Sequence, residues 1–444
     1  MAKLWLEALY YSGPDRIPLA SCFLSMSSAI TAQSVSPAIP ELPLASVFNP
    51  EFDFLLACCA GGSRTEPAER IRETRPLNWK RLIDLAEHHG VIPQIYRSLA
   101  DVQEPSYPDS LRQAHETSAR KTLWLTRELL RILAELRSCG IVALPYKGPV
   151  LAELLYGNVT LRQFSDLDLL IQSSDLPRIK SALAKLGYEL GVQLTPSEER
   201  EYVESGYEYA FDCAHGRNLV EVQWRILPRF YSVDFDIEGF FDRAITFSLG
   251  GTTLRTLCAE DLLLVLCVHA AKHAWKQLSW LCDIAELARS PQIDWRAVQE
   301  HAKHLGIQRI VAVTFFLAYK LLETPLPQFV QGKVQKGPPT KLRLGGYFTS
   351  IENLANEISP MLAGEADYNP ESISYFHLMI RARERRRDRI KFLWRLIVTP
   401  SVGEWSAIRL PGPLFPLYRA VRIFRLLSRF LPRVISRETS RSGR

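Results

Sequence analysis

The sequence predicts an α+β fold in which a small mixed β-sheet is flanked by helical segments on both sides. Apolar residues recur at three- and four-residue steps over 51–140 and again over 257–322, as on one face of an amphipathic helix. Between these regions the pattern changes to short apolar runs typical of strands. The composition, 47% hydrophobic and 23% charged, is that of a globular protein.

The helical segments are the clearest of these elements. "LNWKRLIDLAEHHGVIPQIYRSL" and "KTLWLTRELLRILAELRSCG" both have helical spacing, and the second ends on Gly140, a residue that commonly caps helices. "IVALPY" and "DLDLLI" are short strand candidates. "YEYAFDCA" and "NLVEVQW" indicate a hairpin whose turn is "HGR".

A chain of 444 residues is long enough for two to three domains. We divide it into a disordered N-terminal tail (1–47), an N-terminal helical region (48–140), a strand-containing core (141–250), a second helical region (251–323), a Pro- and Gly-rich linker (324–340) and a basic, mostly helical C-terminal region (341–444). The pattern W-x6-A-x-H-x-G begins at Trp79 and again at Trp295, which indicates two related helix-turn-helix units. Independent capping of two helices would give the same pattern.

Charge and cysteine content exclude some classes of protein. No uncharged apolar stretch reaches the 18 residues of a membrane-spanning helix. The eight cysteines form no CxxC pair, which argues against a disulfide framework or a zinc–thiolate site and favours the cytoplasm. Residues 381–444 carry 17 Lys and Arg against 4 Asp and Glu, whereas the other 380 residues carry 37 against 44.

The basic C-terminal region is compatible with two different arrangements. Arg419, Arg422, Arg425 and Arg429 fall on one helical stripe. Such a stripe can contact an anionic surface, either a membrane to which the protein binds peripherally or a nucleic acid. The alternative is a solvated face of a helix that packs on the acidic body of the protein.

Two aspartates in the apolar run "DLDLLI" are the strongest functional signal. Asp166 and Asp168 fall on the same face of the predicted strand, roughly 6.5–7 Å apart at Cα. Two unpaired carboxylates that close repel each other in a dry site, and oxygen-ligated Mg²⁺ removes that repulsion. Asp168→Asn is therefore expected to raise the melting temperature slightly without metal. Glu221 is a third candidate ligand, and Glu208 and Asp212 on the other hairpin strand are the alternatives to it.

The segment before the aspartates has the residue types of a phosphate site. Lys147 and Gly148 lie between a predicted strand and the predicted helix "PVLAELLYG". A helix N-terminus approached through glycine can bind phosphate. Lys147 and Arg162 can neutralise a polyphosphate, although ordinary surface charges are the alternative.

Three segments together carry a resemblance to a known family: the pattern K-G-x-x-L-x4-Y-G-x4-R-x-x-S-D-L-D-L-L, "VEVQWRI" and "HAAKHAWKQLSWLCDIAEL". They resemble the uncharacterised bacterial nucleotidyltransferase family of the DNA polymerase β-like superfamily. They are also similar to the nucleotidyltransferase toxins of abortive-infection systems. The resemblance covers about residues 48–430. It departs from the family in Pro149, which replaces a phosphate-binding amide, and in Gln223, where members often carry histidine.

The resemblance implies a polymerase β-like sheet in the core region and a Mg²⁺-dependent transfer of a nucleoside monophosphate from a nucleoside triphosphate (NTP), with release of pyrophosphate. The acceptor is unknown: a small molecule, glycan, protein or nucleic acid. Two Mg²⁺ ions, or Mn²⁺ in their place, are implied. The implied metal ligands and catalytic residues are Asp166, Asp168 and Glu221, and the implied nucleotide contacts are Lys147, Gly148, Arg162 and Ser165. The alternatives are an inactive nucleotide-binding or interaction protein on the same fold, and a toxin-like nucleotidyltransferase.

His269 and His273 are the remaining candidates. They are four residues apart on a predicted helix, so both can contact one metal ion. No Glu accompanies them in an HExxH pattern. A structural role, or a place beside Lys272 in the nucleotide cleft, is the expectation that we favour.

Overall fold

The computed structural model describes residues 48–60, 76–100, 107–213, 219–335, 351–364, 372–400, 408 and 410–425. The predicted N-terminal tail, the hairpin turn at 215–217 and Arg429 lie outside these residues. None of the described helices combines the length and the apolar character that a membrane crossing requires.

A five-stranded mixed sheet organises the chain, with the strand order β1-β2-β5-β4-β3. β2 and β5 are parallel, and the other three neighbouring pairs are antiparallel. The strands are β1 (Ala143–Pro145), β2 (Asp166–Ile171), β3 (Tyr188–Leu190), β4 (Glu208–Cys213) and β5 (Leu219–Gln223). The α+β fold and the β4–β5 pairing are therefore confirmed.

A separate antiparallel hairpin of β6 (Ile245–Leu249) and β7 (Thr252–Thr256) contacts β1. Gly250 and Gly251 form its turn, and both have positive φ angles (54° and 79°). A two-residue turn of this kind needs left-handed backbone, which glycine adopts without steric cost. The hairpin crosses residue 250, where the sequence predicted the core to end.

The two faces of β2 meet different cores, as its period-2 pattern predicts. Leu167, Leu169 and Ile171 pack in a core that includes α6 (Asp109–Ser138) and α8 (Leu176–Lys185). Leu170 packs instead in a second, larger core of helices. Because Asp166 and Asp168 share the face of Leu170, the aspartates point to the side of this larger core.

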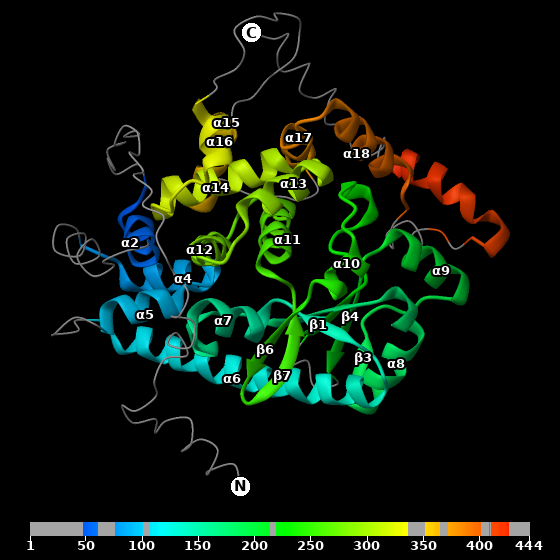
Figure 1. Cartoon of the computed structure of the whole chain (residues 1–444), viewed down its shortest axis with the longest axis horizontal. Helices are drawn as coiled ribbons and strands as arrows, with labels where there is room; N and C mark the ends of the chain where they lie inside the picture. The colour runs from blue at the N-terminus through cyan, green and yellow to red at the C-terminus, as the bar shows by residue number, and fades with distance from the viewer. Residues whose placement is uncertain are drawn as a thin grey trace, which may run out of the picture. The chain divides into compact units, whose positions relative to one another are not determined.

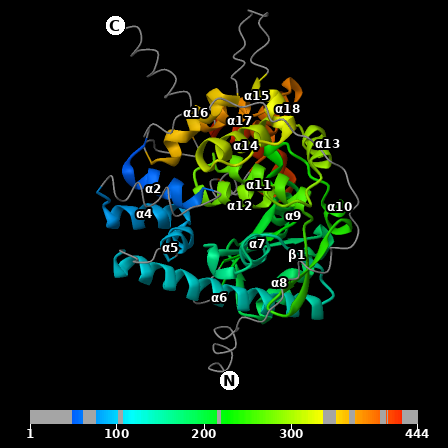
Figure 2. The same ribbon diagram turned by 60° about the vertical axis from the view of Figure 1, so that its left-hand side comes forward.

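The helical regions before and after the sheet form one body in space. Their buried side chains belong to a single core, and α2 contacts α14 (Figures 1 and 2). The helices concerned are α2 (Pro50–Cys59), α4 (Trp79–His89), α5 (Ile92–Ala100), α11 (Ala259–Lys272), α12 (Leu278–Ala288), α13 (Trp295–Leu305) and α14 (Gln308–Leu322).

The repeated W-x6-A-x-H-x-G pattern corresponds to two helices with the same caps. The side chains of Asn78 and Asp294 accept hydrogen bonds from backbone amides at the starts of α4 and α13. Gly90 and Gly306 end these helices in the left-handed conformation, with φ of 68° and 71°. Each helix is followed at once by another, α5 or α14, so a helix-turn-helix stands at both positions, as predicted. The shared caps fit both related units and independent capping.

The remaining elements surround these two cores. Part of the predicted linker is helical, because Val330 is fully buried and anchors α15 to the helical core. These elements are α7 (Gly148–Tyr156), α9 (Pro196–Ser205), α10 (Ile237–Asp242), α15 (Gln328–Gln335), α16 (Ile351–Leu362), α17 (Ile373–Arg381), α18 (Arg386–Val398) and the 3-10 turns η2 (Val159–Leu161), η3 (Ser173–Asp175), η4 (Arg229–Tyr231) and η5 (Gly412–Leu417). A further helical segment covers 418–425.

Candidate active site

A cavity of about 800 Å³ is lined by residues from the sheet, α7, α11 and α12. Every site residue that the sequence predicted lies on its wall, although these residues span 75 positions of the chain. They are Lys147, Gly148, Arg162, Ser165, Asp166, Asp168 and Glu221. The structure thus brings the predicted residues together in one place.

Carboxylates gather on the strand side of the cavity. Asp168 on β2 is the register partner of Glu221 on the parallel strand β5, and Asp166 lies two residues before it. Glu208 on β4 also lines the cavity, whereas Asp212 on the same strand is exposed and is not among the lining residues. Of the two alternatives to Glu221 that the sequence left open, only Glu208 therefore joins this group.

The acids repel one another and are partly withdrawn from water. Burial, together with the charges of Asp168 and Glu208, raises the pKa of Glu221 to about 8. Burial and the neighbouring charge of Asp168 also raise the pKa of Asp166. Without a cation this group of carboxylates thus holds a proton near neutral pH.

Lys147 neutralises part of this charge. Its Nζ donates a hydrogen bond of 2.8 Å to Asp168 Oδ1, and the two residues are only 8% and 3% exposed. Burial lowers the pKa of Lys147, but the charge of Asp168 outweighs this effect and raises it above the ordinary value. The expectation of two unpaired aspartates is therefore wrong for Asp168, and Lys147 is not an ordinary surface charge.

Gln223 connects three of the carboxylates. Its Nε2 donates to Asp168 Oδ1 at 3.1 Å, to Glu221 Oε2 at 3.3 Å and to Glu208 Oε2 at 3.4 Å. The hydroxyl of buried Tyr146 donates to Gln223 Oε1, which turns the amide nitrogen toward the acids. In the sequence, Gln223 is noticeable only as a departure from a family pattern, and Tyr146 was not predicted as a site residue. The position of Tyr146 next to Lys147 was the one signal in the sequence that could have indicated it.

Arg162 is fixed by a second buried ion pair. Its Nε donates to Asp283 Oδ2 at 2.9 Å, and the hydroxyl of Tyr156 donates to Asp283 Oδ1 at the same distance. Burial lowers the pKa of Arg162, and the charge of Asp283 more than restores it. The guanidinium on the cavity wall is therefore charged and positioned by α7 and α12.

The turn into α7 brings its backbone close to β2. Gly148 has a φ of 53°, and a Cβ at this position would lie 3.4 Å from the carbonyl oxygen of Asp166. Pro149 follows as an early helical residue, where its fixed φ suits the helix. Ser165 is exposed at the edge of the same cavity. The N-terminus of α7, with its partial positive charge, thus lies on the cavity wall.

The opposite wall comes from α11 and α12. Burial lowers the pKa of His269 well below its usual range and that of His273 to about 3, so both imidazoles are neutral. Trp280 packs on both, with ring centroids 5.1 and 5.2 Å away. Lys272 Nζ donates to the hydroxyl of Tyr207 at 2.7 Å. The expected place of the histidines beside Lys272 in the cleft is confirmed.

A turn of two left-handed residues brings α11 and α12 to the same cavity. Ala274 and Trp275 have φ angles of 51° and 54°, which cost of order 1–3 kcal/mol each in residues other than glycine. Both are fully buried, and Trp275 Nε1 donates to Thr314 Oγ1 at 2.8 Å. This packing holds the turn, after which Lys276 and Trp280 face the cavity.

The donor set suits a hard divalent cation in its chemistry. Asp166, Asp168 and Glu221 supply carboxylate oxygens, and their raised pKa values reflect a repulsion that a cation relieves. Across the described ranges, no three His, Cys, Asp or Glu side chains are close enough to hold a metal ion together. Lys147 and Gln223 both bond directly to Asp168. His269 and His273 likewise form no metal group in these ranges.

Comparison with known proteins gives one match that covers most of the described core. The profile of a family described as uncharacterised nucleotidyltransferase matches residues 75–323, which include the sheet, the cavity and both of its walls. A search of curated protein sequences found no match.

Solved structures give only distant likenesses. A crystal structure of ANT(2″)-Ia in complex with adenylyl-2″-tobramycin is 15% identical, covers 44% of this chain and 97% of that one, and has a TM-score of 0.25. A nucleotidyltransferase-like protein from Paracoccidioides brasiliensis is 17% identical, covers 46% of this chain and 94% of that one, and also has a TM-score of 0.25. Likenesses this weak do not bear on the chemistry of this chain.

Proposed function

The chain belongs to the uncharacterised nucleotidyltransferase family, and from this premise we propose that it transfers a nucleoside monophosphate from an NTP to an acceptor hydroxyl or phosphate, releasing pyrophosphate. The observation that carries the proposal is the meeting of three acidic side chains, a buried lysine and a buried arginine in one cavity. Phosphoryl-type transfer depends mostly on positioning and on neutralising charge, and these residues are suited to both.

Asp166, Asp168 and Glu221 would hold Mg²⁺, or Mn²⁺ in its place. When bound, such cations stabilise charge on the phosphoryl oxygens and on the attacking and leaving oxygens. Gln223 donates hydrogen bonds to both Asp168 and Glu221. These bonds hold the two carboxylates oriented on the acidic wall of the cavity. Their fixed strand positions reduce the reorganisation needed as the reaction proceeds.

The cationic side chains would bind the triphosphate. Lys147 lies at the start of α7, and Arg162 is held on the cavity wall by Asp283. Lys272 adds a cation from the opposite wall. Guanidinium and ammonium groups bind phosphate through charge-assisted hydrogen bonds, which are roughly twice as strong as neutral ones.

The neutral wall would bind the flat part of a substrate. His269, His273 and Trp280 present uncharged rings beside the acidic group. A nucleobase or a ring of the acceptor can pack against such a surface by stacking. Neutral imidazoles add no positive charge that would draw the triphosphate away from Lys147 and Arg162.

Label transfer from radioactive nucleotides tests the proposal. The full chain is incubated with each α-labelled NTP, Mg²⁺ and cell extract, and both labelled product and pyrophosphate are measured. Asp166→Asn is the variant to compare: among the described residues no lysine forms an ion pair with Asp166, as Lys147 does with Asp168, so its loss leaves no such ammonium unpaired. Asp212→Asn, an exposed acid on β4 away from the cavity, is the matched control.

We expect transfer by wild type and by Asp212→Asn, and a loss of several orders of magnitude in Asp166→Asn. An inactive nucleotide-binding protein is the second candidate, favoured by the bonds that Lys147 and Gln223 already make to Asp168. It predicts a thermal shift with Mg²⁺ and NTP but no transfer with any of the four nucleotides. Equal transfer by Asp166→Asn and wild type would refute the proposed role of the acids.

A further inference from the structure

Helix α18 has an exposed apolar stripe. Ile390, Leu393, Trp394 and Ile397 are 67, 39, 64 and 38% exposed. Their spacing of three and four residues places them on one side of the helix. Single exposed apolar residues are common on soluble proteins, but four adjacent ones that include a tryptophan mark an interaction surface.

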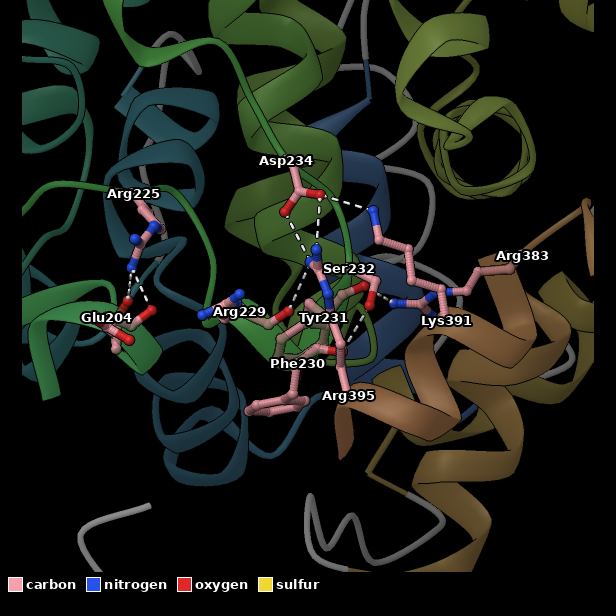
Figure 3. A network of polar contacts seen from close by, with 11 residues as sticks. Glu204, Arg225, Arg229, Phe230, Tyr231, Ser232, Asp234, Arg383, Lys391 and Arg395 are labelled. Carbon is pink, nitrogen blue, oxygen red and sulfur yellow. Dashed lines mark hydrogen bonds and ion pairs between the residues drawn. The ribbon is translucent and has the colours of Figure 1, made fainter. Parts of the chain in front are cut away.

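The other side of α18 is fixed to the protein, so the stripe cannot turn inward. Phe392 and Leu396 are buried beneath the helix. Lys391 and Arg395 form ion pairs of 2.8 and 2.9 Å with Asp234 in the segment after β5 (Figure 3).

A second contact lies before the helix. The guanidinium of Arg383 is buried against the ring of Phe392. It also donates to the carbonyl oxygen of Tyr231 (Figure 3). The bond to Tyr231 and the ion pairs with Asp234 join residues that lie about 150 positions apart in the sequence. The outward direction of the stripe is thus a fixed feature of the fold.

The apolar surface continues into the segment that follows η5. Arg422 is buried, and its Nε donates to the carbonyl oxygen of Leu396 at 2.7 Å, which places this segment at the end of α18. Arg422 is therefore no part of a solvated arginine stripe, contrary to the expectation from sequence. The exposed apolar side chains of η5 and of this segment are Leu414, Leu417, Ile423 and Phe424. Together with the stripe of α18 they form what we call the C-terminal apolar surface.

Basic residues flank the C-terminal apolar surface. Arg386 and Arg387 are exposed on α18, and Arg419 is exposed beyond η5. Asp388 is the single acidic residue among the described residues from 386 to 425, and it contacts Arg387. The charge of this side of the protein therefore complements an anionic partner.

We propose that the C-terminal apolar surface docks on an anionic membrane surface. An interfacial helix places large apolar side chains at the boundary of headgroups and acyl chains, and its flanking Lys and Arg contact the lipid phosphates. α18 has both features, with Trp394 among its apolar residues. Nucleic acid would account for the basic residues but leaves the exposed Ile390 and Trp394 without a role. This inference does not depend on the proposed transfer activity.

Co-sedimentation with lipid vesicles tests the proposal on the full chain. One set of vesicles contains phosphatidylcholine alone, and the other contains an added fraction of phosphatidylglycerol. The test variant is Ile390→Ser with Trp394→Ser, two exposed positions that leave the buried side of α18 intact. The matched control is Val142→Ser with Ile245→Ser, which removes two exposed apolar side chains from the region of the sheets (50 and 40% exposed).

We expect wild type and the control to bind anionic vesicles, and the test variant to bind them about tenfold more weakly or worse. Binding to phosphatidylcholine alone should be weak for all three. Circular dichroism melts establish that each variant is folded. The proposal is overturned if wild type does not sediment with anionic vesicles, or if the test variant binds as wild type does. It is equally overturned if light scattering shows a dimer that depends on Trp394, because a second copy then covers the surface.

Discussion

Two isosteric substitutions in the acidic group are expected to change stability in opposite directions. Asp168→Asn removes the counter-charge of Lys147 and leaves its ammonium buried. Removing one partner of a buried ion pair costs about 3–5 kcal/mol. Glu221→Gln instead removes a charge that burial and neighbouring acids already oppose. The first variant should therefore be less stable, which reverses the slight rise in melting temperature expected from the sequence, because Asp168 is paired with Lys147. The second should be more stable at high pH.

The pH dependence follows from the raised pKa of Glu221. The folded protein holds this proton until about pH 8, whereas the unfolded chain releases it near the ordinary value of 4.5. Between these values the unfolded state loses its proton first, so the free energy of unfolding falls as pH rises, and the loss is complete above about pH 8. At about 1.4 kcal/mol per pKa unit, the upper limit of this loss is on the order of 5 kcal/mol.

Urea unfolding in EDTA at pH 5.5 and pH 9 measures both effects. Asp168→Asn should be less stable than wild type at both values. Glu221→Gln should exceed wild type by only about 1.4 kcal/mol at pH 5.5, one unit above the ordinary value of 4.5, and by more at pH 9. Asp212→Asn, an exposed acid on β4, should change little at either pH. A Glu221→Gln protein that loses as much stability with pH as wild type would refute the reasoning, as would an Asp168→Asn protein of unchanged stability.

Three further outcomes are expected. Asp283→Asn leaves the buried Arg162 without its counter-charge and should lower the free energy of unfolding by about 3 kcal/mol, measured in urea. Gly306→Ala should lower the melting temperature more than Gly187→Ala. Both glycines have positive φ (71° and 81°). The new Cβ at 306 would lie 2.4 Å from Asp388 Oδ2, whereas the new Cβ at 187 meets no atom within 4 Å. An NTP with Mg²⁺ should raise the melting temperature of wild type more than the same NTP in EDTA, in differential scanning fluorimetry.

The local sequence pattern was sufficient to predict much of the fold and several of the residues that line the candidate site. The alternation of β2 is a property of its own six residues, so the faces of Asp166 and Leu167 could be predicted without any partner. The caps of α4 and α13 are equally local, since Asn78 and Gly90 act within one turn of the helix. The same holds for Lys147, whose place between a strand and a helix is set by its neighbours in sequence.

Pairing between distant residues was beyond the sequence. Gln223 reaches Asp168 only because β2 and β5 are parallel neighbours, and no periodicity specifies which strands pair. Asp283 binds Arg162, which lies 121 residues away, and no local pattern around either residue indicates that pair. The packing of the helices before and after the sheet into one core is also a long-range arrangement that the sequence did not predict. In each case tertiary packing made a choice that local propensity left open.

The cavity depends on this long-range packing as much as on the aspartate motif. Asp166 and Asp168 supply one wall, but the second wall comes from α11 and α12, and two polar pairs are among the contacts that fasten it to the first. One is the pair of Arg162 with Asp283 on α12, and the other is the bond from Lys272 on α11 to Tyr207 beside β4. Both contacts join polar groups that are largely withdrawn from water, where an unmatched charge is costly. The helical region after the sheet is therefore part of the site, and loosening either contact should affect substrate binding without touching a carboxylate.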